Sequence, residues 1–75
     1  MRPIKRSLTI AGHKTSISLE PLFWEALKDV AAVEGMTVTG LVAKLDAERA
    51  AEDGDTSGLS SRVRIHILRH YRGGR

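Results

Sequence analysis

The sequence predicts a small, mainly α-helical protein with one short β-ribbon, and three observations support this prediction. Residues 14–19 alternate polar and apolar side chains, with the period of two that is typical of a half-buried strand. Residues 20–34 and 37–49 repeat apolar side chains at helical spacing instead. A chain of 75 residues is expected to form one domain, 1–75. The core of such a domain is small unless a second copy adds to it.

Residues 14–19 form the predicted strand. Its odd-numbered side chains would face a core, and its even-numbered ones would face outward. A lone strand leaves backbone N–H and C=O groups without partners. The simplest partner is the same strand of a second copy, so we expect an intertwined homodimer with an intermolecular antiparallel two-stranded sheet. The outward side chains are those of Lys14, Ser16 and Ser18.

The first twelve residues are basic and contain a second, weaker alternation. Leu8 and Ile10 occupy even positions, whereas the apolar residues of 14–19 occupy odd ones, so one regular strand cannot bury both sets on one face. A turn, bend or bulge near Gly12 must intervene. The segment is either a short edge strand or an ordered arm, and we assign residues 1–12 as a basic N-terminal arm.

Two helices follow the strand. The first is predicted over residues 20–34, because Pro21 suits a first helical turn and Gly35 is common just past a helix end. The second is predicted over residues 37–49, with Thr37 or Thr39 as its cap. Their apolar faces contain Phe23, Leu27, Val30 and Ala31 in the first helix, and Val38, Leu41, Val42 and Leu45 in the second.

The C-terminal third of the chain predicts a loop and a further helix. Residues 50–58 are polar and glycine-bearing, which is typical of a loop. A third helix is predicted over residues 60–72, because an apolar stripe runs from Val63 to Tyr71 and serines precede it. The alternative is a strand, since residues 62–67 alternate regularly and are rich in β-branched side chains.

Charge is segregated along the chain, whose net charge is +3. Residues 1–19 carry four basic side chains and residues 59–75 carry five arginines, and neither segment contains an acid. Residues 20–58 hold three basic and all nine acidic side chains, a net −6. Basic ends favour contact with a polyanion, although two solvated tails would have the same composition.

The sequence gives little support for an enzyme, a metal site or a cofactor. It has no cysteine, no Ser-His-acid signature and no glycine-rich phosphate loop. His66 and His70 are spaced four residues apart, but two ligands are too few to hold a metal ion. No apolar run has the length of a membrane span or a signal core, so we expect a cytoplasmic protein without membrane contact.

The order of strand, proline-started helix, glycine-bearing turn and threonine-capped helix resembles the ribbon-helix-helix family of Arc- and MetJ-like DNA-binding proteins. Residues 35–39, Gly-Met-Thr-Val-Thr, are similar to the turn of that family. More narrowly, residues 12–20, the pair Phe23-Trp24 and residues 59–61, Leu-Ser-Ser, resemble a small bacterial subfamily of stand-alone ribbon-helix-helix proteins.

The resemblance implies a homodimer that inserts its β-ribbon into the DNA major groove, which is wide enough for one. Base contacts would come from Lys14, Ser16 and Ser18, and phosphate contacts from the first turn of the second helix. The implied phosphate-binding residues are Thr37, Val38 and Thr39, the auxiliary basic residues are Arg2, Lys5, Arg6 and His13, and the dimer core is Ile17, Leu19, Phe23, Leu27, Leu41, Val42 and Leu45.

Two functions are therefore in competition. The first is a homodimeric, sequence-reading DNA-binding protein that regulates transcription. The second is a protein-interaction module, antitoxin-like or adaptor-like, that keeps the dimer scaffold and uses its basic ends to dock an acidic protein. Steep salt dependence of duplex binding would separate the first from the second.

Overall fold

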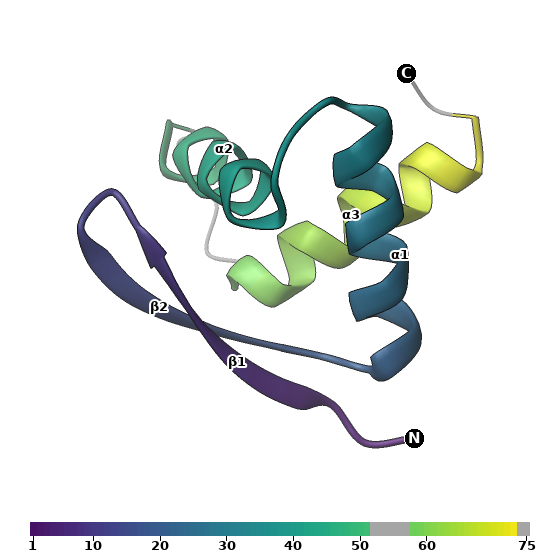
Figure 1. Ribbon diagram of the computed structural model, residues 1–75, viewed down its shortest axis with the longest axis horizontal. Helices are drawn as coiled ribbons and strands as arrows, with labels where there is room; N and C mark the ends of the chain where they lie inside the picture. Colours follow the sequence, from purple (N-terminus) through teal and green to yellow (C-terminus); the bar gives the residue numbers. More distant parts are fainter. Residues whose placement is uncertain (52–57, 74–75) are drawn as a thin grey trace.

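The computed structural model describes residues 1–51 and 58–73, and these contain two strands followed by three helices (Figure 1). The two strands form an antiparallel hairpin that lies along one side of the helices. The expected fold class, a ribbon followed by helices with a third helix near the C-terminus, is confirmed. The elements are β1 (Ile4–Ile10), β2 (His13–Leu19), α1 (Pro21–Val33), α2 (Val38–Ala51) and α3 (Leu59–Tyr71).

A two-residue turn, Ala11-Gly12, joins β1 to β2. Both turn residues have positive φ, 51° at Ala11 and 82° at Gly12, as in the tight hairpin turns whose twist matches that of the strands. The turn places Ile10 opposite His13, so each even-numbered residue of β1 faces an odd-numbered residue of β2. The apolar side chains of both strands therefore share one face of the sheet, which resolves the conflict of register in the sequence.

The strand β2 has its partner within its own chain. Residues 1–12, expected as a basic arm, contain β1, which pairs with β2 along the full length of both strands. The sheet in the structure is thus an intramolecular hairpin, and the expected intermolecular sheet is not shown. The physical reason is that a two-residue turn closes a hairpin at little entropic cost, whereas pairing two copies must overcome the entropy of association.

Proline and glycine mark the ends of α1. Pro21 is its first residue, and Gly35, with φ of 70°, follows its end in the left-handed region. The helix α2 continues to Ala51, and most of the loop expected over residues 50–58 lies outside the described residues. No helix within the described ranges has the length and apolar character that crossing a membrane requires.

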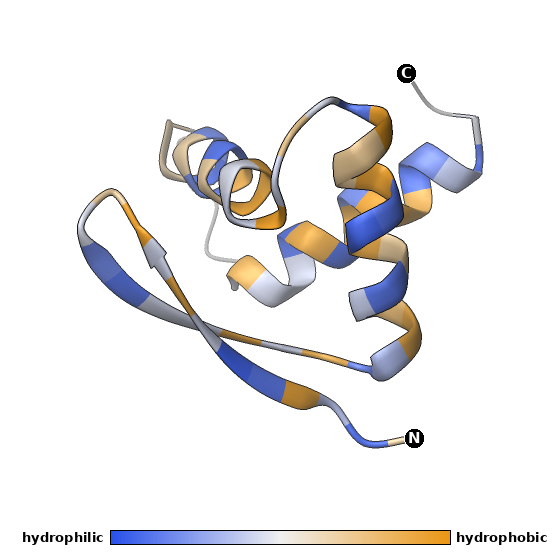
Figure 2. Cartoon of the chain, in the orientation of Figure 1, coloured by the Kyte–Doolittle hydropathy of each residue, from blue (hydrophilic) through white to orange (hydrophobic). Residues whose placement is uncertain are grey.

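The core lies between the inner face of the hairpin and the three helices. Figure 2 shows apolar and polar residues interspersed along both strands, and the register places the apolar ones on one face of the hairpin. In α1, Trp24 is only 4% exposed whereas Phe23 is half-buried, so the buried stripe begins at Trp24 and not at Phe23 as expected. The buried apolar residues are Ile10, Ile17, Leu19, Trp24, Leu27, Val30, Ala31, Leu41, Val42, Leu45, Val63 and Ile67.

Candidate nucleic-acid interface

The face of the hairpin that points away from the helices is polar and basic, and we call it the outer face. At its centre Ser7 and Ser16 lie opposite each other, and their Oγ atoms form a hydrogen bond of 3.4 Å. On either side of this pair a lysine lies opposite a hydroxyl residue. The outer face comprises Lys5, Ser7, Thr9, Lys14, Ser16 and Ser18, all of them exposed except the half-buried Ser18.

The chemistry of the outer face suits a polyanion. It carries two lysines, four hydroxyl side chains and no acid. A lysine ammonium donates to phosphate oxygens or to guanine acceptors, and a serine or threonine hydroxyl can donate or accept. The three outward residues expected from the sequence, Lys14, Ser16 and Ser18, all lie on this face. A two-stranded antiparallel ribbon is also a shape that the major groove of B-DNA admits.

Half of the outer face comes from β1, and sequence reasoning finds little of it. Lys5 is expected only as an auxiliary basic residue, and Ser7 and Thr9 are missed. The signal was present, because a change from even to odd apolar positions across the two residues Ala11-Gly12 is what a tight hairpin produces.

The other expected basic residues lie away from the outer face. The guanidinium of Arg6, on the inner side of β1, lies 5.0 Å from the centroid of the Trp24 ring, within cation–π range. His13 lies beside the hairpin turn, also on the inner side, and Arg2 precedes β1 in an exposed segment. Of the four auxiliary residues, the structure therefore brings only Lys5 onto the outer face.

The N-terminal half of α3 covers the free edge of β2 at Ser18. The backbone N–H of Ser18 donates to Ser60 Oγ at 3.0 Å, and its carbonyl accepts from Arg64 Nη2 at 3.1 Å. Arg64 also donates to Glu20 Oε1, from Nε at 3.1 Å and from Nη2 at 2.9 Å, and its guanidinium lies 5.8 Å from the Phe23 ring centroid. Because side chains already satisfy this backbone, no further strand can pair with β2 at Ser18.

The same contacts show that α3 is not simply a basic face. Arg64 is used inside the chain, and Arg62 Nη2 lies 4.0 Å from Glu48 Oε1. The pKa of the Glu20 carboxyl is held below its usual 4.5, first by the hydrogen bond from its own backbone N–H and then by that from Arg64. Sequence reasoning treats these arginines as one basic group, and the pairing with Glu20 is a long-range contact that no local pattern reveals.

The start of α2 has the features expected of a helix cap. Thr37 Oγ1 accepts a hydrogen bond of 2.9 Å from the backbone N–H of Gly40. A Cβ added at Gly40 would lie 3.0 Å from that oxygen, so the glycine accommodates the capping hydroxyl and not a neighbouring helix. Val38 and Thr39 follow in the first turn, where backbone N–H groups have no acceptor within the helix and can bind an anion.

The residues expected to form a dimer core are buried within a single chain. Six of them, Ile17, Leu19, Leu27, Leu41, Val42 and Leu45, are at most 2% exposed, because β1 and α3 cover the core. Phe23 alone is half-buried.

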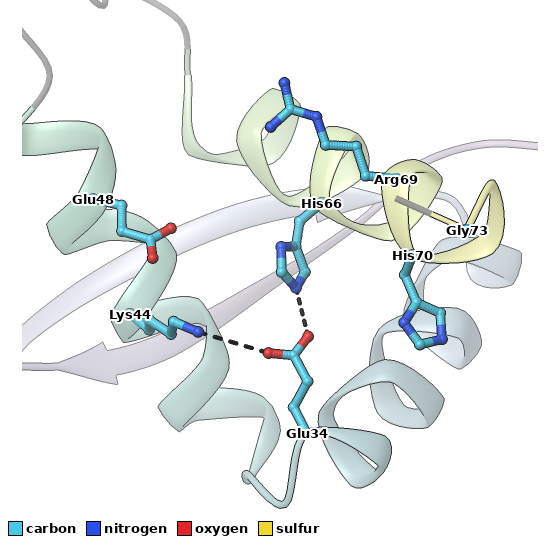
Figure 3. Close-up of a pocket in the computed structure, with 7 residues that line it drawn as sticks. All are labelled: Glu34, Lys44, Glu48, His66, Arg69, His70 and Gly73. Atoms are coloured by element: carbon cyan, nitrogen blue, oxygen red, sulfur yellow. Dashed lines mark hydrogen bonds and ion pairs between the residues drawn. The ribbon is translucent and has the colours of Figure 1, made fainter. Parts of the chain in front are cut away.

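A charged cavity of about 900 Å³ lies where α2 and α3 meet the end of α1 (Figure 3). Glu34 is one of its lining residues, with Oε2 2.6 Å from His66 Nε2 and Oε1 3.8 Å from Lys44 Nζ. His66 therefore joins a polar network that links the three helices. Across residues 1–51 and 58–73, no three potential metal-ligating side chains come together. The cavity is lined by Glu34, Lys44, Glu48, His66, Arg69, His70 and Gly73.

Comparisons with known proteins agree with the fold. A family model described as "Ribbon-helix-helix domain" matches residues 3–71. A solved structure, that of an uncharacterized protein from Bordetella pertussis Tohama I, is similar with a TM-score of 0.79 and 37% sequence identity. The similarity covers 93% of this chain and 56% of that one, so this chain spans little more than half the length of that relative. A search of curated proteins found no match. Because the matched residues include the hairpin and all three helices, this chain belongs to the ribbon-helix-helix domain family.

Proposed function

We propose that this protein is a homodimeric DNA-binding protein that regulates transcription in a bacterial cytoplasm, with the outer face of the hairpin in the major groove. The observation that carries the proposal is the outer face itself, a two-stranded ribbon with two lysines, four hydroxyl groups and no acid. The family to which the chain belongs supports a DNA-binding or regulatory role in general.

In this proposal both strands of the hairpin contribute residues that contact DNA. Lys5 and Lys14 lie near opposite ends of the outer face, so each can reach a phosphate or a guanine edge while the hydroxyl residues between them approach the bases. The backbone N–H groups of Val38 and Thr39 supply a separate phosphate contact, assisted by the dipole of α2. Hydroxyl side chains discriminate bases weakly, so the expected sequence preference is modest.

The test is binding of the purified protein to genomic fragments, including the DNA around its own gene, over a series of salt concentrations. Affinity should fall steeply as salt rises, because neutralised phosphates release counterions. Replacing Lys14, Ser16 and Ser18 together by alanine should remove the preference for the best fragment, while circular dichroism shows an unchanged fold. Absence of duplex binding even at low salt would refute the proposal and favour a protein partner.

A further inference from the structure

The two strands of the hairpin repeat the same outward side chains nine residues apart. On the outer face, each residue of β1 has a counterpart of the same chemical type in β2. On the inner face the repeat is incomplete, since Arg6 of β1 corresponds to Thr15 of β2. The matched outer residues are Lys5 and Lys14, Ser7 and Ser16, and Thr9 and Ser18.

The register relates these counterparts by a local two-fold axis. Two antiparallel strands have such an axis, normal to the sheet, at the midpoint of each directly opposed pair of residues. The axis at the central pair exchanges Ser7 with Ser16, whose Oγ atoms form the hydrogen bond of 3.4 Å, and it exchanges Lys5 with Lys14. The two halves differ at one end, because Ser18 is half-buried beside α3 whereas its counterpart is exposed. A single chain therefore displays two chemically equivalent halves on its outer face.

Folding alone does not require this match. The alternation of a half-buried hairpin requires only that the outer residues be polar, and it does not require lysine to correspond to lysine or serine to serine. On the inner face, where contact with the helices limits the choice of residue, the repeat is broken at Arg6, whose guanidinium lies over the ring of Trp24. The match is thus complete on the face that is open to a ligand.

We propose that one hairpin reads a DNA element that itself has two-fold symmetry, a short inverted repeat, with β1 contacting one half and β2 the other. The inference rests on the proposed function and specifies the class of DNA sequence and the residues that read it. The two strands of a duplex are antiparallel, so an inverted repeat has a dyad with which the axis of the hairpin can coincide. Lys5 then meets in one half the guanine edge that Lys14 meets in the other. This applies to each hairpin of a homodimer.

The separation of the two lysines suits a single groove. Lys14 lies opposite Thr9, which is four residues from Lys5 along the ribbon. At about 3.3 Å per residue, the lysines are about 13 Å apart in this direction. This length corresponds to about four base pairs of B-DNA, which is less than half a turn of the duplex. Both halves of the element therefore lie within reach of one hairpin.

The test begins with a randomised duplex library from which the wild-type protein selects its preferred element. The selected sequence should be an inverted repeat. A second duplex then carries the same element with one half replaced, and the affinity for each duplex is measured at low salt. The wild type should bind the intact element at least about fivefold more tightly, because on the second duplex one lysine loses its guanine.

Two single variants then test whether both strands read bases. Lys5→Ala and Lys14→Ala should each reduce the preference for the intact element to less than about twofold, because a variant with one intact half can turn round and use the half that remains. Both lysines are exposed, so circular dichroism should show an unchanged fold. The control is Lys28→Ala, on α1, which should keep the full preference of the wild type.

The outcomes separate this inference from the proposed function. If either Lys5→Ala or Lys14→Ala keeps the full preference, or if the selected sequence has no two-fold symmetry, the inference is overturned and DNA binding by the outer face stands. If the wild type binds no duplex even at low salt, the proposed function fails and the inference fails with it.

Discussion

Glu20 connects three parts of the molecule through one carboxylate. It lies between β2 and α1, and its Oε1 accepts two hydrogen bonds from Arg64 of α3. The pKa of this carboxyl is lowered by the hydrogen bond from its own backbone N–H and, second, by Arg64. A lowered pKa in the folded state means that the ionised form is favoured by folding.

This gives Glu20 a definite effect on acid stability. The stabilisation is complete above the pKa that the carboxyl has in the unfolded chain, and it is lost as the pH falls through the lower pKa of the folded state. The wild type should therefore lose unfolding free energy between about pH 6 and about pH 3, and Glu20→Gln should lose less over the same range. Urea titration at each pH measures both losses. In an Arg64→Ala background the effect of Glu20→Gln should shrink but persist, because the backbone N–H remains. An identical pH profile in wild type and Glu20→Gln would show that this carboxyl contributes nothing.

Residue-scale features were predictable where a local rule fixes them. A threonine cap at Thr37 or Thr39 and the need for a turn near Gly12 both follow from local rules, and the structure shows Thr37 as the cap. The pairing of Arg64 with Glu20 spans 44 residues, so no window of sequence contains it. The burial of Trp24, where the sequence predicted that of Phe23, has the same origin, because the Nε1 of Trp24 donates to the Ile4 carbonyl of β1 at 3.0 Å.

At the scale of elements, the intramolecular hairpin is the largest difference from the expected fold. A regular pattern shows that a strand has an apolar face, but it does not show which strand completes the sheet. The expected partner was the β2 of a second copy, whereas the observed partner is β1 of the same chain, and the difference depends on whether Ala11-Gly12 can form a tight turn. Ala11 with φ of 51° is a less obvious turn residue than asparagine or aspartate.

A pair of cysteines tests the hairpin directly, because the wild-type chain has none. Ser7 and Ser16 lie opposite each other with Oγ atoms 3.4 Å apart, so a Ser7→Cys and Ser16→Cys double variant should oxidise to a disulfide within one chain. Non-reducing electrophoresis should then show a monomer that migrates faster than the reduced chain. A covalent dimer would show instead that the strands of two copies lie beside each other.

The contribution of α3 to the core can be measured at two isoleucines of the same helix. Ile67 is 3% exposed and Ile65 is 42% exposed. Ile67→Ala should lower the unfolding free energy by about 2–4 kcal/mol because it leaves a cavity, whereas Ile65→Ala should change it by less than about 1 kcal/mol. Equal effects in chemical denaturation would mean that α3 does not pack as described.

At the scale of the whole molecule, net charge is a weaker guide than the position of each charge. The chain carries a net charge of only +3, and several of its basic side chains are engaged in internal contacts, among them Arg6, Arg49 and Arg64. The two lysines of the outer face lie on one surface without a neighbouring acid. From the sequence, both basic ends were expected to contact a polyanion. In the folded chain, some basic side chains of those ends make internal contacts and others do not.

Salt dependence should reflect that arrangement. If each lysine of the outer face neutralises one phosphate, replacing Lys5 and Lys14 together by alanine should reduce the slope of log affinity against log salt by about two per chain. Lys28→Ala is the control, since Lys28 lies on α1 and pairs with Glu25 at 3.5 Å. It removes one positive charge away from the outer face and should leave the slope unchanged. Equal slopes for all three proteins would place the DNA contact elsewhere.

The closure of β2 by α3 also has a consequence for synthesis on the ribosome. Ser60 and Arg64 follow Ser18 by 42 and 46 residues, so the nascent hairpin is made several seconds before the residues that cover it, at about 5–20 residues per second. During that interval the backbone at Ser18 is open to strands of neighbouring nascent chains. Products terminated before α3 should therefore aggregate during translation. In the complete chain, α3 covers the backbone at Ser18 as soon as this last helix docks.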